Sequence, residues 1–214
     1  EDDAAVVPLF AKLAYPFAYR IVAPDCCEVG RWEKKRIAYA GYHELAYLHP
    51  NHFTPDASRI SDLDPTRPYF ILRFAQLTAH HDEGRSGITA NVARQLVGLL
   101  SVHGRIFITS ERPLEAEFEQ YRMRIDPSVM HHALAFASLY IGDSQTMAAE
   151  AAVLGTPSVR FNDFVGQIGY LGDLEARGLS FGIPASRPEQ LLQTVKDLLS
   201  DLPGSRLRAT AARA

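Results

Sequence analysis

Cysteine is almost absent from the sequence: the 214 residues include only two, the adjacent Cys26 and Cys27. Neighbouring residues rarely reach disulfide geometry, so we expect thiols and a reducing, cytoplasmic setting. No apolar run approaches the roughly 20 residues that a membrane-spanning helix needs, and no signal-peptide pattern opens the chain. These absences predict a cytoplasmic protein without a membrane span, for which peripheral contact with the inner face of a membrane stays open.

An excess of basic residues is missing too, because 22 Lys and Arg stand against 25 Asp and Glu, for a formal net charge of -3. Such a balance argues against nucleic acid as a partner. No Gly-x-Gly-x-x-Gly fingerprint follows a predicted strand, which disfavours an NAD-dependent dehydrogenase. The first residue is not Met and a helical pattern begins at once, so we expect a missing amino-terminal part. What is present is 47% hydrophobic residues, enough for a substantial core.

Short apolar runs alternate with helical patterns from Pro68 onward. The predicted strands are Tyr69-Phe70-Ile71-Leu72, Arg105-Ile106-Phe107-Ile108-Thr109, Leu139-Tyr140-Ile141, Pro157-Ser158-Val159-Arg160 and Leu179-Ser180-Phe181-Gly182. The predicted helices cover residues 87–101, 128–137, 144–154, 170–177 and 188–199, the first with Ser86 as its cap. Strands that alternate with helices need right-handed crossovers, so the sequence predicts a doubly wound α/β domain with a parallel, Rossmann-like sheet.

The first third of the chain is less regular. A helical pattern interrupted by prolines covers residues 4–17, and short strands are predicted at residues 20–24 and 36–39. We therefore divide the chain into a remnant of an amino-terminal Rossmann-like domain (1–24), an inter-domain connector (25–67), a ligand-binding Rossmann-like domain (68–200) and a carboxyl-terminal tail (201–214).

A polar turn after the third of the regular strands carries most of the functional argument. It leads into a helix of small residues that stops at Gly155. Backbone N–H groups at a helix start attract anions, so a diphosphate fits there, and a carboxylate further along the same helix face is in reach of a ribose diol. The candidate contacts are Gly142, Asp143, Ser144, Gln145, Thr146 and Glu150. The structural alternative is equally simple: an N-cap at Asp143 or Ser144, a solvated Glu150 and a C-cap at Gly155.

Here the sequence resembles a known family. The turn and helix just described, followed by Leu154-Gly155-Thr156-Pro157, are similar to domain of unknown function family 354, which is related to glycosyltransferase-B enzymes. The resemblance extends over most of the chain, through Gly41-Tyr42-His43-Glu44-Leu45-Ala46-Tyr47-Leu48, Arg73-Phe74, Ala79-His80-His81-Asp82 and Gly87-Ile88. One departure is Asp2-Asp3-Ala4-Ala5, where the family tends to have a histidine after an acidic pair.

The resemblance implies the carboxyl-terminal half of a glycosyltransferase-B-like fold, in which this half holds a nucleoside-diphosphate sugar. It places the diphosphate at Ser144 and the ribose at Glu150. The implied reaction is glycosyl transfer to a saccharide or lipid-linked acceptor of the cell envelope or a polysaccharide, with no cofactor beyond the donor sugar. The missing amino-terminal domain would supply much of the acceptor site, so this chain by itself is expected to bind more readily than it turns over.

Two other functions remain open at this point. The first is a nucleotide-sugar 2-epimerase-like reaction, in which carboxylates and histidines serve as acid and base. The second is a non-catalytic module that binds a nucleotide sugar or docks a partner. Product analysis separates transfer from epimerisation, because only transfer needs an acceptor.

Other polar residues follow the predicted strands. His80, His81 and Asp82 form a dense cluster that suits general acid–base catalysis. Metal binding by these residues, with His131 and His132, is disfavoured because no zinc-ligand spacing is present. Arg73 could neutralise a diphosphate, or could simply pair with Asp82 or Glu83. Weaker candidates are Ser110-Glu111-Arg112-Pro113 for the base, Asn162-Asp163-Phe164-Val165-Gly166 for the sugar, and Tyr42, His43 and Glu44 at the hinge.

Overall fold

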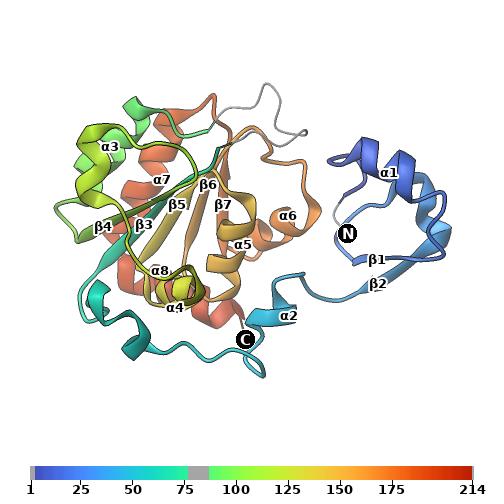
Figure 1. Cartoon of the computed structure of the whole chain (residues 1–214), viewed down its shortest axis with the longest axis horizontal. Coiled ribbons are helices and arrows are strands. Elements are labelled where there is room, and N and C mark those ends of the chain that lie inside the picture. The colour runs from blue at the N-terminus through green and yellow to red at the C-terminus, as the bar shows by residue number, and fades with distance from the viewer. Residues whose placement is uncertain (1–2, 77–86, 214) are drawn as a thin grey trace.

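A five-stranded parallel sheet forms the centre of the larger part of the molecule (Figure 1). The structure, a computed structural model, describes residues 3–76 and 87–213. The sheet has the order β4-β3-β5-β6-β7, and its strands are β3 (Tyr69–Phe74), β4 (Arg105–Ser110), β5 (Leu139–Gly142), β6 (Ser158–Phe161) and β7 (Ser180–Ile183). All five were predicted from the sequence, and their positions are confirmed to within two residues.

Helices cover both faces of this sheet, as a doubly wound fold requires. One face packs on α3 (Ala90–Leu100) and α7 (Pro188–Ser200). The other packs on four helices, namely α4 (Met130–Phe136), α5 (Gln145–Val153), α6 (Gly169–Ala176) and α8 (Leu202–Arg213). The predicted α/β class and parallel sheet are therefore confirmed. The segment expected to be a tail forms α8, where Arg206 donates hydrogen bonds to the carbonyls of Ala135 and Ala137 at the end of α4.

The start of α3 differs from the sequence-based expectation. Thr89 is its N-cap, because its side chain accepts a hydrogen bond from the backbone N–H of Val92 at 3.4 Å. The helix then buries Val92, Leu96 and Leu100, which are four residues apart and lie on one face of the helix. Ser86, the expected cap, lies outside the described residues, and the helix begins three residues later than predicted.

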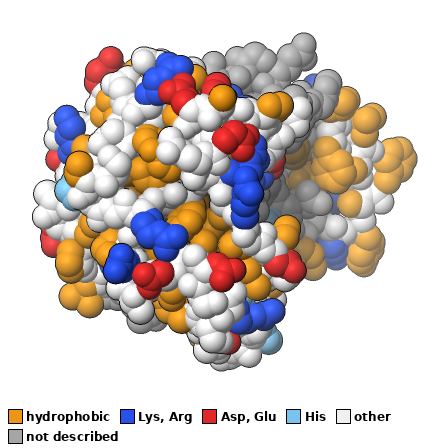
Figure 2. Space-filling view, turned by 60° about the vertical axis from the view of Figure 1, so that its left-hand side comes forward, with side chains coloured by type: hydrophobic (Ala, Val, Ile, Leu, Met, Phe, Trp, Pro, Cys, Tyr) orange, Lys and Arg blue, Asp and Glu red, His pale blue; other side chains and the backbone are white. Residues whose placement is uncertain are grey.

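A smaller unit precedes the main sheet. It contains α1 (Pro8–Ala14), β1 (Ile21–Pro24), a 3-10 helix at Gly30–Lys35 and β2 (Arg36–Tyr39), and the two strands pair in parallel. Pro8 stands at the start of α1, where its missing N–H costs nothing, so it begins the helix and does not interrupt it. Figure 2 shows hydrophobic side chains gathered at the right of the view, and those most exposed in this unit are Leu13, Phe17 and Tyr19.

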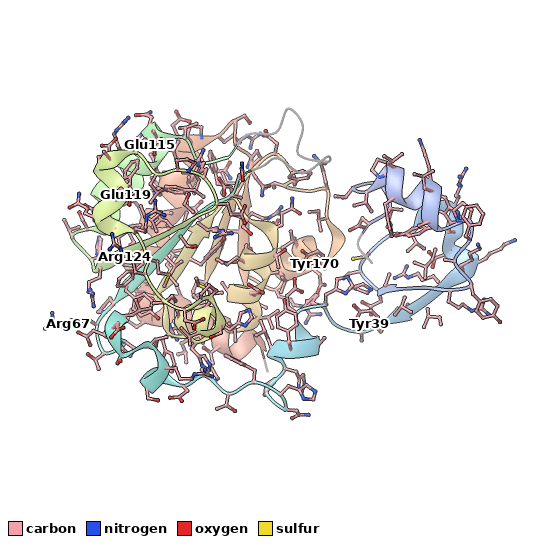
Figure 3. All side chains as sticks on the ribbon, in the orientation of Figure 1. Tyr39, Arg67, Glu115, Glu119, Arg124 and Tyr170 are labelled. Atoms are coloured by element: carbon pink, nitrogen blue, oxygen red, sulfur yellow. The ribbon has the colours of Figure 1, made fainter. Side chains whose placement is uncertain are left out.

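Residues 40–68 connect the two parts and pack on the main domain. They form α2 (Leu45–Leu48), which contacts α5, and a 3-10 helix at Ala57–Leu63, which contacts α4. Short 3-10 helices also occur at Ala116–Tyr121 and Pro127–Val129. Tyr39 of β2 is labelled in the smaller unit and Tyr170 of α6 on the side of the main domain that faces it (Figure 3). The ring of His43 contacts both, tilted against Tyr39 at a centroid distance of 6.2 Å and edge-on to Tyr170 at 6.5 Å.

The first described residue, Asp3, ties the smaller unit to α6. Its carboxylate accepts hydrogen bonds from the backbone N–H groups of Gly169, at 2.6 Å, and Glu28, at 2.7 Å. An acidic side chain at a helix start is favoured by the helix dipole. Asp3, in the segment where the sequence departs from the family pattern, therefore links the smaller unit to the start of α6. Cys26 and Cys27 are thiols, as expected.

Candidate functional site

The order of the strands contains one topological switch point, at which successive strands begin to be added on the opposite side of β3. From β3 the chain crosses to β4 on one side, then returns past β3 to β5 and continues to β6 and β7. Ligands of open α/β sheets bind outside the carboxyl ends of the strands at such a switch point, here between β3 and β5. Arg73, near the end of β3, is the direct neighbour of Gly142, the last residue of β5. Two segments predicted separately from the sequence therefore meet at the expected place.

Gly142 has no room for a side chain. A Cβ atom there would lie 2.8 Å from the Cβ of Arg73 and would overlap the hydroxyl group of Tyr140. In the registered row across the sheet, Gly142 stands between Arg73 and Arg160. Arginine positions of both neighbouring strands thus flank Gly142 in the sheet.

Ser144 begins α5 as its N-cap. Its backbone is extended, and its Oγ accepts a hydrogen bond from the N–H of Met147 at 3.4 Å. Of the two residues that follow it, Gln145 is partly buried and Thr146 is exposed. Their side chains make no hydrogen bond within the described part of the chain. The helix start therefore offers backbone N–H groups together with polar side chains at the switch point.

Asp143 has a different position from its neighbours. Its side chain is buried, and the carboxylate accepts hydrogen bonds from the backbone N–H groups of Ala75, at 2.6 Å, and Ile88, at 3.1 Å. Burial raises the pKa of this carboxyl to about 6, although both backbone hydrogen bonds lower it. Gly87 is needed beside it, because a Cβ there would lie 2.5 Å from Oδ2. The carboxylate therefore joins the backbone just after β3, at Ala75, to the backbone just before α3, at Ile88.

Arg73 is already paired within the protein. It donates to Oγ1 of Thr109 at 2.8 Å and forms an ion pair with Glu111. The sequence suggested Asp82 or Glu83 as partners, and these lie outside the described residues. Glu111 is 47% exposed while Arg73 is 15% exposed, so the carboxylate stands on the solvent side of the guanidinium.

Glu150 lies on the face of α5 that looks toward α2 and α4. Its Oε1 accepts a hydrogen bond from the hydroxyl of Tyr47 at 3.1 Å and contacts Nε2 of His131 at 3.0 Å. The side chain is 12% exposed, so it is not the solvated residue of the structural alternative. Burial and the nearby carboxylate raise the pKa of Tyr47, which keeps its hydroxyl protonated as a donor. Neither Tyr47 nor His131 was identified as a partner of Glu150 from the sequence.

Buried polar side chains support the edge of the sheet beside the site. Arg160 of β6 is 1% exposed and donates to Glu175 of α6 at 2.9 Å, a pair that sequence reasoning missed. Asn162, a weaker candidate for a sugar contact, is buried. Its Nδ2 donates to the carbonyl of Asp143 at 2.9 Å, and its Oδ1 accepts from the N–H of Phe164 at 3.0 Å. Asn162 therefore fixes the loop after β5 from the neighbouring strand.

Several other candidates lie apart from the switch point or outside the described residues. His80, His81 and Asp82 belong to the second group. Tyr42 donates a hydrogen bond to Asp173 of α6, beside a cavity of about 370 Å³ that also includes Gly41, Arg177 and Leu179. This cavity lies between the connector and α6.

Among residues 3–76 and 87–213, no group of three or more His, Cys, Asp or Glu side chains is arranged to hold a metal ion. His132 accepts a hydrogen bond from the backbone of Asp56 at 3.0 Å, and burial lowers its pKa. None of the helices in these residues has both the length and the apolar character needed to cross a membrane.

The fold is shared with solved structures of low sequence identity. Scans of family models and of curated proteins gave no match, so membership of family 354 is not confirmed. The glycotransferase of kitacinnamycin matches with a TM-score of 0.53 and 13% identity, over 92% of this chain and 50% of that one. Os79 from O. sativa, in complex with U2F and trichothecene, matches with a TM-score of 0.50 and 15% identity, over 82% and 44%. The chain thus spans about half the length of these proteins and has a Rossmann-like fold of the glycosyltransferase-B type.

Proposed function

We propose that this chain is the nucleotide-sugar-binding half of a glycosyltransferase-like enzyme and that it holds the diphosphate of its donor at the start of α5. The observation that carries the proposal is the position of Ser144. It caps a helix two residues after the end of β5, at the topological switch point, with Arg73 on the neighbouring strand. A helix start and a guanidinium together suit an anion of high charge.

Arg73 has capacity for such a ligand. Its Nε is buried and makes no hydrogen bond with the described residues, and its partner Glu111 is half exposed. Turning Glu111 away would cost this ion pair, which contributes about 0–1 kcal/mol when a partner is exposed, and the hydrogen bond that Glu111 accepts from the backbone N–H of Gln76 at 3.0 Å. A diphosphate carries more charge and can accept two hydrogen bonds from one guanidinium. We therefore infer that Arg73 binds the diphosphate when the donor is present and pairs with Glu111 when it is absent.

The remaining residues of the turn receive distinct roles in this proposal. Gly142 permits close approach to the sheet edge, while Gln145 and Thr146 offer side chains and backbone at the helix start. Asp143 acts as a positioning residue in place of a ligand contact, because its carboxylate is bonded to Ala75 and Ile88. Glu150 binds the ribose.

The reaction assigned is glycosyl transfer from a nucleoside-diphosphate sugar to a saccharide or lipid-linked acceptor. The positive charge at the helix start and on Arg73 would stabilise the departing diphosphate, and rigid binding would orient the sugar. His80, His81 and Asp82 remain the proposed acid–base groups. The likeness to a glycotransferase supports this choice at the level of the fold.

Calorimetric titration of the chain with the common nucleoside diphosphates and their sugars tests the proposal. We expect one nucleotide to bind, and Ser144→Ala and Arg73→Met each to weaken it by about 1–3 kcal/mol, the usual value of a hydrogen bond to a charged group. Ser101→Ala and Arg94→Met are matched controls, because Ser101 lies at the far end of α3 and Arg94 pairs with Glu117 on an exposed surface. A folded chain that binds none of these nucleotides contradicts the proposal and favours a docking module.

A further inference from the structure

We propose that Tyr47 and His131 are positioning residues that hold one oxygen of Glu150 so that its other oxygen selects a ribose over a deoxyribose. This inference rests on the proposed function, because it concerns the same nucleotide. It goes beyond that function by naming two residues from other elements and a property of the ligand that they control.

The first step is the geometry around Glu150. Tyr47 and His131 both contact Oε1, at 3.1 and 3.0 Å. They come from the connector helix α2 and from α4, so three separate elements meet at one carboxylate. Two donors on a single oxygen fix the plane of a carboxylate more strongly than one donor does. The Glu150 side chain is thus oriented before any ligand arrives.

The second step concerns the other oxygen. Oε2 of Glu150 accepts no hydrogen bond from the described residues, and it is not among their buried unpaired atoms. A carboxylate can accept about four hydrogen bonds, so capacity remains on the side that the solvent reaches. The hydroxyl groups of a ribose can donate hydrogen bonds to this oxygen.

The third step is the packing behind the donors. The rings of Tyr47 and His131 lie 5.5 Å apart, and Phe53 meets His131 edge to face at 6.0 Å. These contacts limit the motion of both donors, whose side chains are partly exposed. The arrangement suits selection between ligands, because a largely buried, oriented carboxylate that loses its hydroxyl partner is penalised on binding a deoxy analogue.

The test compares affinities of the chain for ribonucleoside diphosphates with those for the 2′-deoxy and 3′-deoxy analogues. We expect the wild-type chain to prefer the ribonucleotide by about tenfold or more, the range of a hydrogen bond to a charged group. Glu150→Gln, Tyr47→Phe and His131→Asn should each reduce this ratio, while affinity for the less favoured deoxy analogue stays within about twofold. His131→Gln should restore part of the ratio, since its amide nitrogen approximates Nε2.

Two substitutions serve as matched controls. Tyr39→Phe removes a hydroxyl that bonds His43 at 2.8 Å, in the same half of the chain but away from Glu150. His103→Asn changes an exposed histidine after α3. An unchanged ribose preference in Tyr47→Phe and His131→Asn, with binding intact, overturns the inference and leaves the proposed function standing. Absence of nucleotide binding by the wild-type chain overturns both.

Discussion

Replacement of Asp143 by asparagine should change how the stability of the protein depends on pH. The carboxyl is buried, and burial raises its pKa to about 6 from an ordinary 3.8. Asparagine has nearly the same shape and carries no charge, but its one oxygen replaces only one of the two acceptors, because Oδ1 of Asp143 bonds Ala75 and Oδ2 bonds Ile88. The absolute stability of the two proteins will differ for several reasons, whereas their pH-dependent difference isolates this carboxyl.

The sign and the magnitude follow from linkage. A carboxyl with a raised pKa in the folded state binds its proton more tightly there than in the unfolded state, so the free energy of unfolding falls as pH rises between the two values. The two pKa values of Asp143, 3.8 and about 6, correspond to about 3 kcal/mol in total. About half of this lies between pH 5 and pH 8, because titration of the folded form is nearly complete near pH 7.

Urea denaturation of wild type and Asp143→Asn at several pH values between about 5 and 8 measures this difference. We expect wild type to lose stability relative to the variant as pH rises, and the difference to become constant above about pH 7. A difference that does not vary with pH would refute the reasoning. If the two backbone donors outweighed burial and lowered the pKa, the difference would be flat in this range and would rise with pH only below about pH 4.

Two further substitutions test the packing around the site by urea denaturation. Gly142→Ala should destabilise the protein by about 1–3 kcal/mol, because its new methyl group overlaps the hydroxyl of Tyr140. Gly98→Ala is the control: it has open space around it on α3, so it should be neutral or stabilise the protein by up to about 1 kcal/mol. Glu175→Gln should cost about 2–3 kcal/mol, because the 1% exposed Arg160 loses its counter-charge, although Glu175 is itself 26% exposed. An equal effect of the two glycine substitutions, or no effect of Glu175→Gln, would contradict these interpretations.

The sequence predicted the sheet well because its signals are local. The strand at Tyr69–Phe74 is an apolar run buried on both faces, and such runs are recognisable without knowledge of their neighbours. The start of α3 was predicted less well, since Ser86 and Thr89 are both reasonable caps and only the structure shows that Thr89 bonds to Val92. Local patterns therefore identified the elements but left a choice at their ends.

The partners of the site residues could not be predicted in the same way. Tyr47 and Glu150 are 103 residues apart, and Asp143 and Ala75 are 68 apart. Only the strand topology could have indicated the partner of Arg73. Because β3 and β4 are parallel neighbours in register, the residues that follow β4 lie next to the end of β3. That reasoning points to Glu111, yet the sequence alone suggested acidic residues of the nearer loop. Pairing of Arg73 with Asp82 or Glu83 stays a prediction, because both acidic residues lie outside the described residues.

Ser144 shows that a structural and a functional role need not exclude each other. As an N-cap it uses a lone pair of Oγ to accept the hydrogen bond from Met147. Its hydroxyl hydrogen is a separate group, and it can donate to an anion at the same time. The cap also fixes the side chain at the helix start, where the dipole and the backbone N–H groups attract the anion. The local structure that favours the structural interpretation would thus also orient a phosphate ligand. Urea denaturation of Ser144→Ala measures the loss of the cap, and a ligand titration of the same folded variant measures the loss of the anion contact.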